Sequence, residues 1–333
     1  RMVAQYARLM VHARQNTFLL PWHDIFRRDK QGLVLDRARL ERLVKVFTDA
    51  GMYYIEGGHV AGRTGGKWEA PTFDIVLGGP RATSVEGNAD LARACRQLME
   101  EITRHDWQNR WIQHVTDEPT PANAVDYRIL AGMVRKYMPG VPILDATMDT
   151  GLAGSVDIWC PQVQEYQRHR EEFEAASALG DRVWVYTCCS PGGPWLNRLL
   201  DMELLRPALI GWAAARYDLD GFLHWGLNQY RPDQDPFNKS VVGHGGSSSL
   251  PAGDTHVVYP GKDGPWSSLR LEAQREGIED LELLRRLKAR HPEQAQRIIS
   301  KVLRGFDDYT KDVKTFRAGR RELLEALDTS PGS

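Results

Sequence analysis

Two acidic side chains, Asp117 and Glu118, stand together inside the run T-D-E-P that ends at Pro119. The run closes an apolar, strand-like segment at 110–117. Successive side chains of a strand point to opposite faces, so both carboxylates can face one ligand only where the strand breaks. Pro119 favours a break because it lacks a backbone donor. Paired carboxylates suit acid and base catalysis at a glycosidic bond. The run D-E-P at 117–119 is also typical of the acidic N-terminus of a helix.

Other polar and aromatic side chains stand at the ends of further strand-like segments. They are Trp22, His23, Glu56, His59, Asp145, Trp159, Tyr186, Trp225, Asn228 and Tyr230. Aromatic rings can stack on the apolar face of a pyranose while carboxylates act on the glycosidic oxygen. The chain contains no G-x-S-x-G elbow, P-loop or H-E-x-x-H motif. This set of residues predicts an aromatic-lined carbohydrate site.

Short apolar runs that alternate with helical patterns must position these residues. Seven strand-like runs lie at 16–21, 52–58, 110–117, 141–147, 157–161, 182–189 and 221–226. Strands that alternate with helices predict parallel pairing through right-handed crossovers. Because a helical pattern precedes the first run, we expect a (β/α)₈ TIM-like barrel whose first strand lies upstream of residue 1. A doubly wound open sheet is the alternative, but no G-x-G-x-x-G follows a first strand.

The segments between the strand-like runs contain residues that predict helix ends and a long loop. Asp36 predicts the cap of a helix that ends before Gly51, and the glycine-rich stretch 58–68 predicts a long loop. Thr120 and Pro121 fit the N-cap and first turn of the next helix. Further helices are expected at 88–106, 163–179 and 199–216.

The C-terminal part of the chain differs in composition from the rest. Residues 231–264 are rich in Pro, Gly and Ser and predict either a lid or a disordered excursion. A charged helix is expected at 267–289, where Arg270, Glu272, Arg275, Glu276, Glu279 and Asp280 can pair along the surface and pin the helix to the barrel. We therefore divide the chain into a barrel at 1–290 and a helical tail at 291–333 that packs on it.

Composition excludes several classes of function. The 333 residues carry 43 Lys and Arg against 44 Asp and Glu, a formal charge of −1, which argues against a nucleic-acid or polybasic membrane binder. No apolar run approaches the roughly 20 residues of a membrane helix, so we expect no membrane insertion. The four cysteines lack metal-ligand spacing and are expected to be buried thiols, without a metal or other cofactor. The chain opens at Arg1 in a helical pattern, so we expect an absent upstream segment. A signal there would make the protein secreted or periplasmic.

Strand number separates two glycosidase mechanisms. Counting the absent strand, Asp117 and Glu118 end strand four, and a retaining enzyme with a protein nucleophile needs a second carboxylate about 5 Å away. In barrels with an acid at strand four, that carboxylate usually comes from strand seven. The corresponding run at 182–189 has no acid at its end, and neither has 221–226. The pattern favours substrate assistance, in which a 2-acetamido oxygen attacks the anomeric carbon.

Three hypotheses follow from this pattern. In the first, Glu118 protonates the leaving oxygen and later deprotonates water, while Asp117 stabilises the acetamide nitrogen of an oxazolinium-like intermediate. In the second, Glu56 or Asp145 supplies another carboxylate and the enzyme acts on non-acetamido sugars. In the third, the barrel binds carbohydrate without catalysis.

Several motifs resemble glycoside hydrolase family 123. They are Y-A-R-L-M-V-H-A-R-Q-N at 6–16, D-E-P at 117–119, G-F-L-H-W-G-L-N at 221–228, G-D-T-H-V-V-Y-P-G at 253–261 and S-L-R-L-E-A-Q-R-E-G-I-E-D at 268–280. The resemblance implies a (β/α)₈ catalytic domain and a β-N-acetylgalactosaminidase acting by substrate-assisted retention, with Asp117 as stabiliser and Glu118 as acid/base. The sequence departs from the family at Thr255 and Leu281, away from the expected chemistry, and leaves no room for the β-sandwich regions that members usually carry.

The expected partner is a glycan or glycoconjugate with a terminal β-N-acetylhexosamine, and six residues are candidates to bind it. Trp225 is expected to form the floor of the sugar or acetamide subsite, although a core Trp is the alternative. Tyr186 is expected to donate its hydroxyl to the acetamide oxygen. Asn228 and Tyr230 suit hydroxyl recognition, although a turn explains Asn228 equally well. Asp145 and Trp159 end neighbouring strands and complete the set.

Overall fold

The computed structural model describes residues 1–147, 150–243 and 248–328. Its centre is a curled parallel sheet of seven strands in the order β1-β4-β7-β8-β9-β10-β11. The strands are β1 (Thr17–Leu20), β4 (Tyr54–Gly57), β7 (Trp111–His114), β8 (Ile143–Thr147), β9 (Ile158–Pro161), β10 (Arg182–Tyr186) and β11 (Gly221–Leu223). Each predicted run forms one of them, and each strand pairs with its neighbour in chain order.

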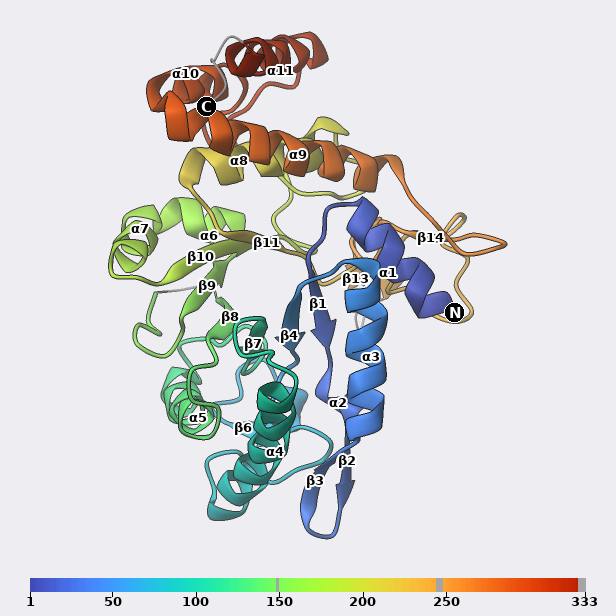
Figure 1. Ribbon diagram of the computed structural model, residues 1–333, viewed down its shortest axis with the longest axis vertical. Coiled ribbons are helices and arrows are strands. Elements are labelled where there is room, and N and C mark those ends of the chain that lie inside the picture. The colour runs from blue at the N-terminus through green and yellow to red at the C-terminus, as the bar shows by residue number, and fades with distance from the viewer. Residues whose placement is uncertain (148–149, 244–247, 329–333) are drawn as a thin grey trace.

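The sheet and its surrounding helices form a (β/α)₈ barrel-like fold, which confirms the predicted fold class (Figure 1). Among the described residues, β1 and β11 are the two edges of this sheet and do not pair with each other. A further strand upstream of residue 1 stays a prediction.

Alternation along the strands creates two buried layers. Leu144 and Ile158 meet Ile112 inside the curl of the sheet, beside Trp184 and Leu223. Their chain neighbours, such as Ile143 and Trp159, belong instead to the large core between sheet and helices. Both faces of such a parallel sheet are covered, which explains why its strands read as continuous apolar runs.

The connecting helices are α1 (Met2–His12), α2 (Trp22–Ile25), α3 (Arg37–Ala50), α4 (Val85–Arg104), α5 (Ala124–Tyr137), α6 (Val163–Arg168), α7 (Arg170–Ala178) and α8 (Leu205–Tyr217). The predicted cap of α3 is confirmed: the Asp36 carboxylate accepts from the amide of Arg39 at 2.9 Å, and Gly51 ends the helix at φ +108°. The predicted cap of α5 is wrong. The Asn123 side chain accepts from the amide of Thr120 at 2.8 Å, so a turn precedes the helix and α5 begins at Ala124.

Two short hairpins interrupt the strand and helix alternation. One pairs β2 (Phe26–Asp29) with β3 (Gly32–Leu35), and the other pairs β5 (Ala61–Arg63) with β6 (Phe73–Ile75). The predicted loop at 58–68 therefore contains a strand and the short helix η1 (Thr64–Gly66). Both hairpins follow strands of the barrel, at the end where the candidate site residues lie.

The C-terminal helices are α9 (Leu269–Arg290), α10 (Pro292–Val302) and α11 (Val313–Asp328). Figure 1 shows α9 lying along α8, with α10 and α11 beyond it at one end of the molecule. Ile298, Val302 and Phe306 are fully buried, as their spacing predicts. Residues 329–333 of the predicted tail lie outside the described residues.

The segment before α9 corrects an expectation. Residues 231–264 contain short strand pairs, β12 (Val242–Gly243) with β13 (Ser249–Leu250) and β14 (Tyr259–Pro260) with β15 (Pro265–Trp266). Residues 244–247 lie outside the described residues. Within the segment, Val257 and Val258 are fully buried against Leu271 and Ala13. The part around Val257 and Val258 is ordered against the rest of the protein, so the prediction of a disordered excursion is wrong there.

The charged motif of α9 is more deeply buried than expected. The Arg270 guanidinium donates to the backbone oxygens of Arg198, Gly253 and His256 at 2.7–2.8 Å. The buried Asp280 carboxylate accepts from the indole of Trp212 and from Arg320. These residues fix α9 through buried hydrogen bonds, whereas Arg275 pairs at the surface as predicted.

The cysteines divide into two classes. Cys95 and Cys160 are buried, and burial raises the pKa of each thiol, so these two match the expectation. Cys188 is half-buried and Cys189 is exposed, which contradicts it, because both follow the end of β10 rather than lying within a covered element. No described helix has the length and apolar character needed to cross a membrane.

The crossing of α8 and α9 gives a stability prediction. A Cβ at Gly277 would collide with the backbone oxygen of Ala208, so we expect Gly277→Ala to lower the free energy of unfolding by about 3 kcal/mol. Gly132 in α5 has no atom near its Cβ position, so Gly132→Ala should raise stability by about 0.5–1 kcal/mol. Urea unfolding of both variants checks this. Equal stabilities would contradict the close helix crossing.

Candidate active site

Asp117 and Glu118 lie on the turn that follows β7. The amides of Val115 and Thr116 both donate to the Asp145 carboxylate at 3.3 Å, so the chain leaves the strand in a fixed direction. Glu118 then takes the left-handed conformation, with φ +44°. This conformation is costly for a residue with a Cβ and persists only where its surroundings hold it. The strand breaks earlier than predicted, because β7 ends at His114 and Val115 and Thr116 lie between it and the acidic pair.

Arg63 holds this turn from outside. Its guanidinium donates to the backbone oxygen of Glu118 at 2.6 Å and lies 4.0 Å from the centroid of the Trp68 ring. The sequence did not point to Arg63, because the glycines at 58–68 predict a long loop there. The hairpin of β5 and β6 is what brings this cation across to the acidic turn.

Tyr186, the last residue of β10, reaches the same turn. Its hydroxyl donates to Glu118 Oε1. Burial raises the pKa of the Glu118 carboxyl, and Asp117 raises it further, against the opposing effects of the Tyr186 hydroxyl and Arg63. A raised pKa favours a protonated carboxyl, which is the form that a general acid needs.

A buried charged layer lies beneath the turn. His114, the last residue of β7, places Nδ1 2.8 Å from Glu56 Oε1 and Nε2 3.3 Å from Asp145 Oδ1. The ring of His59 meets the His114 ring edge-on at 4.6 Å. Burial lowers the pKa of His59 to about 3, and the cations His114 and Arg63 act in the same direction, so His59 is neutral.

Two predicted substrate residues lie away from any open surface. Asp145 is 0% exposed, and its carboxylate accepts from the Tyr127 hydroxyl as well as from the backbone of the turn. Trp159 is 2% exposed, donates to Asp181 at 2.8 Å and packs against Phe173 in the layer beneath the helices. Neither residue ends its strand, because Asp145 lies in the middle of β8 and Trp159 is the second residue of β9. Their side chains are enclosed by protein, so neither reaches a ligand in this conformation.

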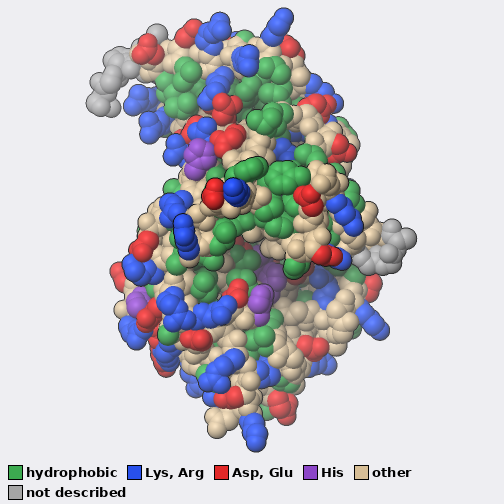
Figure 2. Space-filling view, turned by 90° about the vertical axis from the view of Figure 1, so that its right-hand side faces the viewer, with side chains coloured by type: hydrophobic (Ala, Val, Ile, Leu, Met, Phe, Trp, Pro, Cys, Tyr) green, Lys and Arg blue, Asp and Glu red, His purple; other side chains and the backbone are tan. Residues whose placement is uncertain are grey.

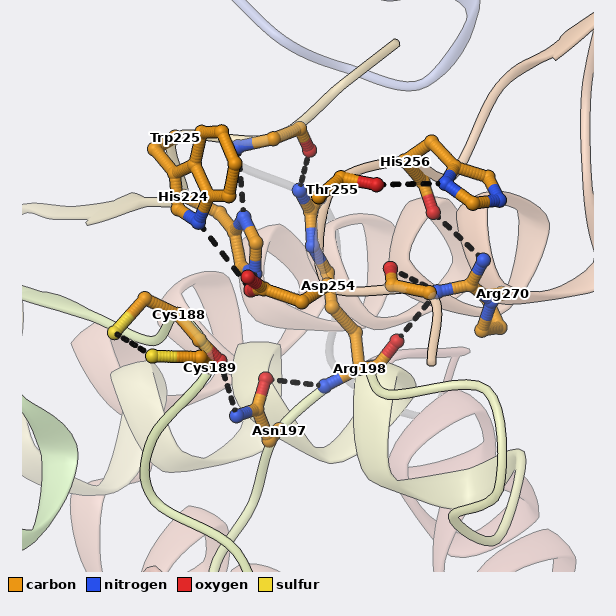
Figure 3. A network of polar contacts seen from close by, with 12 residues as sticks. Cys188, Cys189, Asn197, Arg198, His224, Trp225, Asp254, Thr255, His256 and Arg270 are labelled. Atoms are coloured by element: carbon orange, nitrogen blue, oxygen red, sulfur yellow. Dashed lines mark hydrogen bonds and ion pairs between the residues drawn. The ribbon is translucent and has the colours of Figure 1, made fainter. Parts of the chain in front are cut away.

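Trp225 lies at the end of β11 and is 43% exposed. Its indole donates to Asp254 Oδ1 at 3.3 Å, and His224 Nε2 lies 3.5 Å from the same oxygen. Figure 3 shows the Asp254 carboxylate beside both rings, with Arg198 and Arg270 supporting the chain around it. Arg198 is buried and donates to the backbone oxygen of Gly226, directly after the tryptophan. The indole face is thus presented to solvent by a rigid support.

Asn228 and Tyr230 follow Trp225 in the chain but are held by other neighbours. Asn228 pairs with His256 in an isolated bridge, and the Tyr230 hydroxyl lies 2.9 Å from the Tyr6 hydroxyl of α1. The two residues are half-buried and bound to protein neighbours, while Glu118, Tyr186 and Asp117 meet at the end of β7. Figure 2 shows one face of the molecule hollowed near its middle, with histidine and hydrophobic side chains at the hollow.

A cation would find few ligands in the described part of the chain. One group there, Glu41, Glu101 and His105, has ligand atoms within 4.8 Å of one another. Arg104 already lies 2.7 Å from Glu101 Oε2, so a cationic side chain neutralises this group.

The exposed indole leads to a binding prediction. We expect Trp225→Ala to raise KM for a glycoside about tenfold, or ~1.4 kcal/mol, while kcat changes less. Trp266→Ala is the matched control, since Trp266 is also exposed but lies on β15. Steady-state kinetics checks both variants, and an equal effect of the two would show that Trp225 has no special place at the site.

Known proteins with similar sequences or structures include glycoside hydrolases. The model of the glycoside hydrolase 123 catalytic domain matches residues 81–287. A search of curated proteins gave no significant match. A solved family 123 glycoside hydrolase from Clostridium perfringens, described in work on glycolipid glycan hydrolysis, has a TM-score of 0.73 at 13% identity, over 98% of this chain and 64% of that one.

Two more distant structures share the fold. A β-galactosidase from the psychrophilic Marinomonas ef1 has a TM-score of 0.51 at 9% identity, over 90% of this chain and 60% of that one. A GH5-4 broad specificity endoglucanase from an uncultured bovine rumen ciliate has a TM-score of 0.50 at 12% identity, over 83% and 85%. The match to the Clostridium perfringens enzyme covers less than two thirds of that enzyme's length. Because the family model matches more than half of the sequence, the chain belongs to glycoside hydrolase family 123.

Proposed function

We propose that this protein is a glycoside hydrolase that removes β-linked N-acetylgalactosamine from glycans by substrate-assisted, retaining catalysis. Family membership supports hydrolysis of a glycosidic bond. The substrate is a glycan or glycoconjugate with a terminal β-N-acetylhexosamine. A glycolipid is one such glycoconjugate, and the Clostridium perfringens relative is described in work on glycolipid glycan hydrolysis.

Glu118 is the acid and base of this proposal. In its protonated form it donates a proton to the leaving oxygen as the 2-acetamido oxygen attacks the anomeric carbon. The resulting carboxylate then takes a proton from the water that opens the oxazolinium ring. The raised pKa of Glu118, caused first by burial, supports the acid role.

Asp117 is the stabiliser. It accepts a hydrogen bond from the acetamide N–H, orients the oxygen toward the anomeric carbon and stabilises the positive charge that develops on the nitrogen. The two carboxylates are adjacent in sequence, and the left-handed backbone of Glu118 supports their joint presentation at one turn.

One observation carries the choice of mechanism: the group that reaches Glu118 from β10 is a tyrosine hydroxyl rather than a carboxylate. A retaining enzyme with a protein nucleophile would need a second carboxylate about 5 Å from the acid. Glu56 is paired with His114, and Asp145 is fully enclosed, so neither is available as that nucleophile. The hypothesis of a two-carboxylate enzyme on non-acetamido sugars is correspondingly weak.

The remaining site residues complete the proposal. Trp225 offers an indole face for the sugar, and Tyr186, beside Glu118, is placed to align the acetamide oxygen once Glu118 is protonated. Asn228 and Tyr230 lie further along the same segment and are assigned to more distant sugar hydroxyls. We further propose that residues 1–290 form the catalytic unit and that residues 291–333 are a helical extension of it.

A cyclic analogue of the intermediate tests this function. A GalNAc-thiazoline should inhibit hydrolysis competitively, and proton NMR of the first product should show the β-anomer. Inhibition should weaken in Asp117→Asn, because that residue contacts the ring nitrogen in our proposal. An α-anomer as first product, or no effect of the thiazoline on an active enzyme, would refute substrate assistance.

A further inference from the structure

Three buried charged side chains, Glu56, His114 and Asp145, lie directly beneath the acidic turn. They come from three adjacent strands, β4, β7 and β8, and their side chains are almost fully enclosed. A buried charge is costly unless it is paired. Here each imidazole nitrogen of His114 faces one carboxylate oxygen, at 2.8 Å on the Glu56 side and 3.3 Å on the Asp145 side.

The Glu56 contact of His114 is a hydrogen bond, whereas the Asp145 contact is an ion-pair distance without one. While both carboxylates are ionised, an imidazolium places a positive charge beside each of them, whereas a neutral ring presents a lone pair to one. The Asp145 carboxylate also accepts from the amides of Val115 and Thr116 and from the Tyr127 hydroxyl, so its position fixes the backbone that leads into Asp117. The layer is therefore mechanically connected to the turn.

We propose that His114 is a positioning residue that stays protonated between Glu56 and Asp145 and fixes the catalytic turn through Asp145. This proposal rests on the function proposed above for Asp117 and Glu118. His114 itself touches no substrate and acts on the catalytic turn through Asp145.

The surroundings of His114 favour its charged form. Burial lowers the pKa of His114, but Asp145, Glu56 and Asp117 outweigh burial and raise it to about 8. Groups from the neighbouring elements are the neutral ring of His59 after β4, Arg63 of β5 beside His59, the thiol of Cys160 on β9 and the hydroxyl of Tyr127 on α5. Arg63 is the one further cation among them, and its guanidinium is engaged with the backbone of Glu118.

The sign of the pH effect follows from the raised pKa. A histidine whose pKa rises from 6.5 to about 8 on folding contributes stability that is fully present below pH 6.5 and is lost as the pH passes about 8. Burial raises the pKa of Asp145 to about 7, against the effects of His114, Tyr127 and the amides of Val115 and Thr116. His114 and Asp145 are therefore both charged between about pH 7 and 8, and the layer should support the turn best there and weaken as His114 loses its proton above about pH 8.

Selective labelling of histidine tests the protonation state without any assay of activity. In the ¹³C and ¹⁵N NMR spectrum, one imidazole should titrate near pH 8 and should be absent from the spectrum of His114→Gln. In Glu56→Gln its midpoint should fall by about one unit or more, because one favourable charge is gone. A His114 signal that is neutral at pH 6 in the wild type would overturn the proposal.

Kinetics on an aryl β-GalNAc tests the positioning role. For His114→Gln we expect kcat to fall roughly ten- to a hundredfold with little change in KM, since a misplaced reacting group costs about this much. His12→Gln is the matched control, since His12 also pairs with a glutamate but lies exposed on α1.

The outcomes separate the two proposals. A wild-type enzyme that cleaves no acetamido substrate refutes the proposed function, while the NMR titration still decides whether His114 is held charged. A His114→Gln variant that folds, by circular dichroism, and keeps the wild-type kcat and KM refutes the positioning role alone.

Discussion

Glu118→Gln should lower kcat/KM for an aryl β-GalNAc with a poor leaving group about a thousandfold or more, since general acid and base catalysis typically contributes 10²–10⁴-fold. The glutamine keeps the shape of the side chain and can still interact with the Tyr186 hydroxyl, so the fold should survive. The loss should be smaller for a dinitrophenyl glycoside, because its leaving group departs without a proton. Single-turnover and steady-state rates on both substrates measure this difference.

A matched surface variant makes the result specific. Glu171→Gln changes the same atoms on the exposed first turn of α7 and should keep wild-type rates. If Glu118→Gln retained more than a tenth of the wild-type rate on the poor leaving group, Glu118 would not be the acid.

Asp117→Asn should lower kcat on the same substrate about a hundred- to a thousandfold, the range found when one group that stabilises a developing charge is removed. An amide cannot balance the positive charge on the acetamide nitrogen, although it retains the size of the carboxylate. Thiazoline affinity should fall in parallel, because the analogue carries that nitrogen. Inhibition constants and kcat for the variant, compared with the wild type, provide the measurement.

Asp106→Asn serves as the control for Asp117. Asp106 is exposed and, with φ +55°, lies in a left-handed turn that asparagine also accepts. If Asp117→Asn bound the thiazoline as tightly as the wild type does, Asp117 would not stabilise the acetamide nitrogen. The proposed mechanism would then lack the group that balances this charge.

Much of the fold could be predicted from local sequence signals. Each apolar run forms a strand of the parallel sheet, and Asp36 and Gly51 bound α3 as their residue types predict. The cap of α5 failed because the Asn123 side chain closes a turn before the helix, a choice that Thr120 and Pro121 do not reveal. The buried Val257 and Val258 were missed because polar and glycine residues surround them in sequence.

The candidate site was only partly predictable, for a geometric reason. The apolar runs do not show where each strand ends, and Asp145 and Trp159 lie inside β8 and β9, where side chains alternate between two covered faces. Trp159 therefore packs toward the helices, and Asp145 contacts the backbone of the acidic turn. Arg63 and the pairing of His114 depend on contacts between distant segments, which no local pattern encodes.

The central claim is that the substrate's own acetamide replaces a protein nucleophile. Its most direct test compares turnover of a matched pair, an aryl β-GalNAc and the aryl β-galactoside that carries a 2-hydroxyl in place of the acetamide. We predict turnover of the acetamido substrate and no measurable turnover of the galactoside. Comparable rates on the two would show that the acetamide is not needed and would contradict the mechanism.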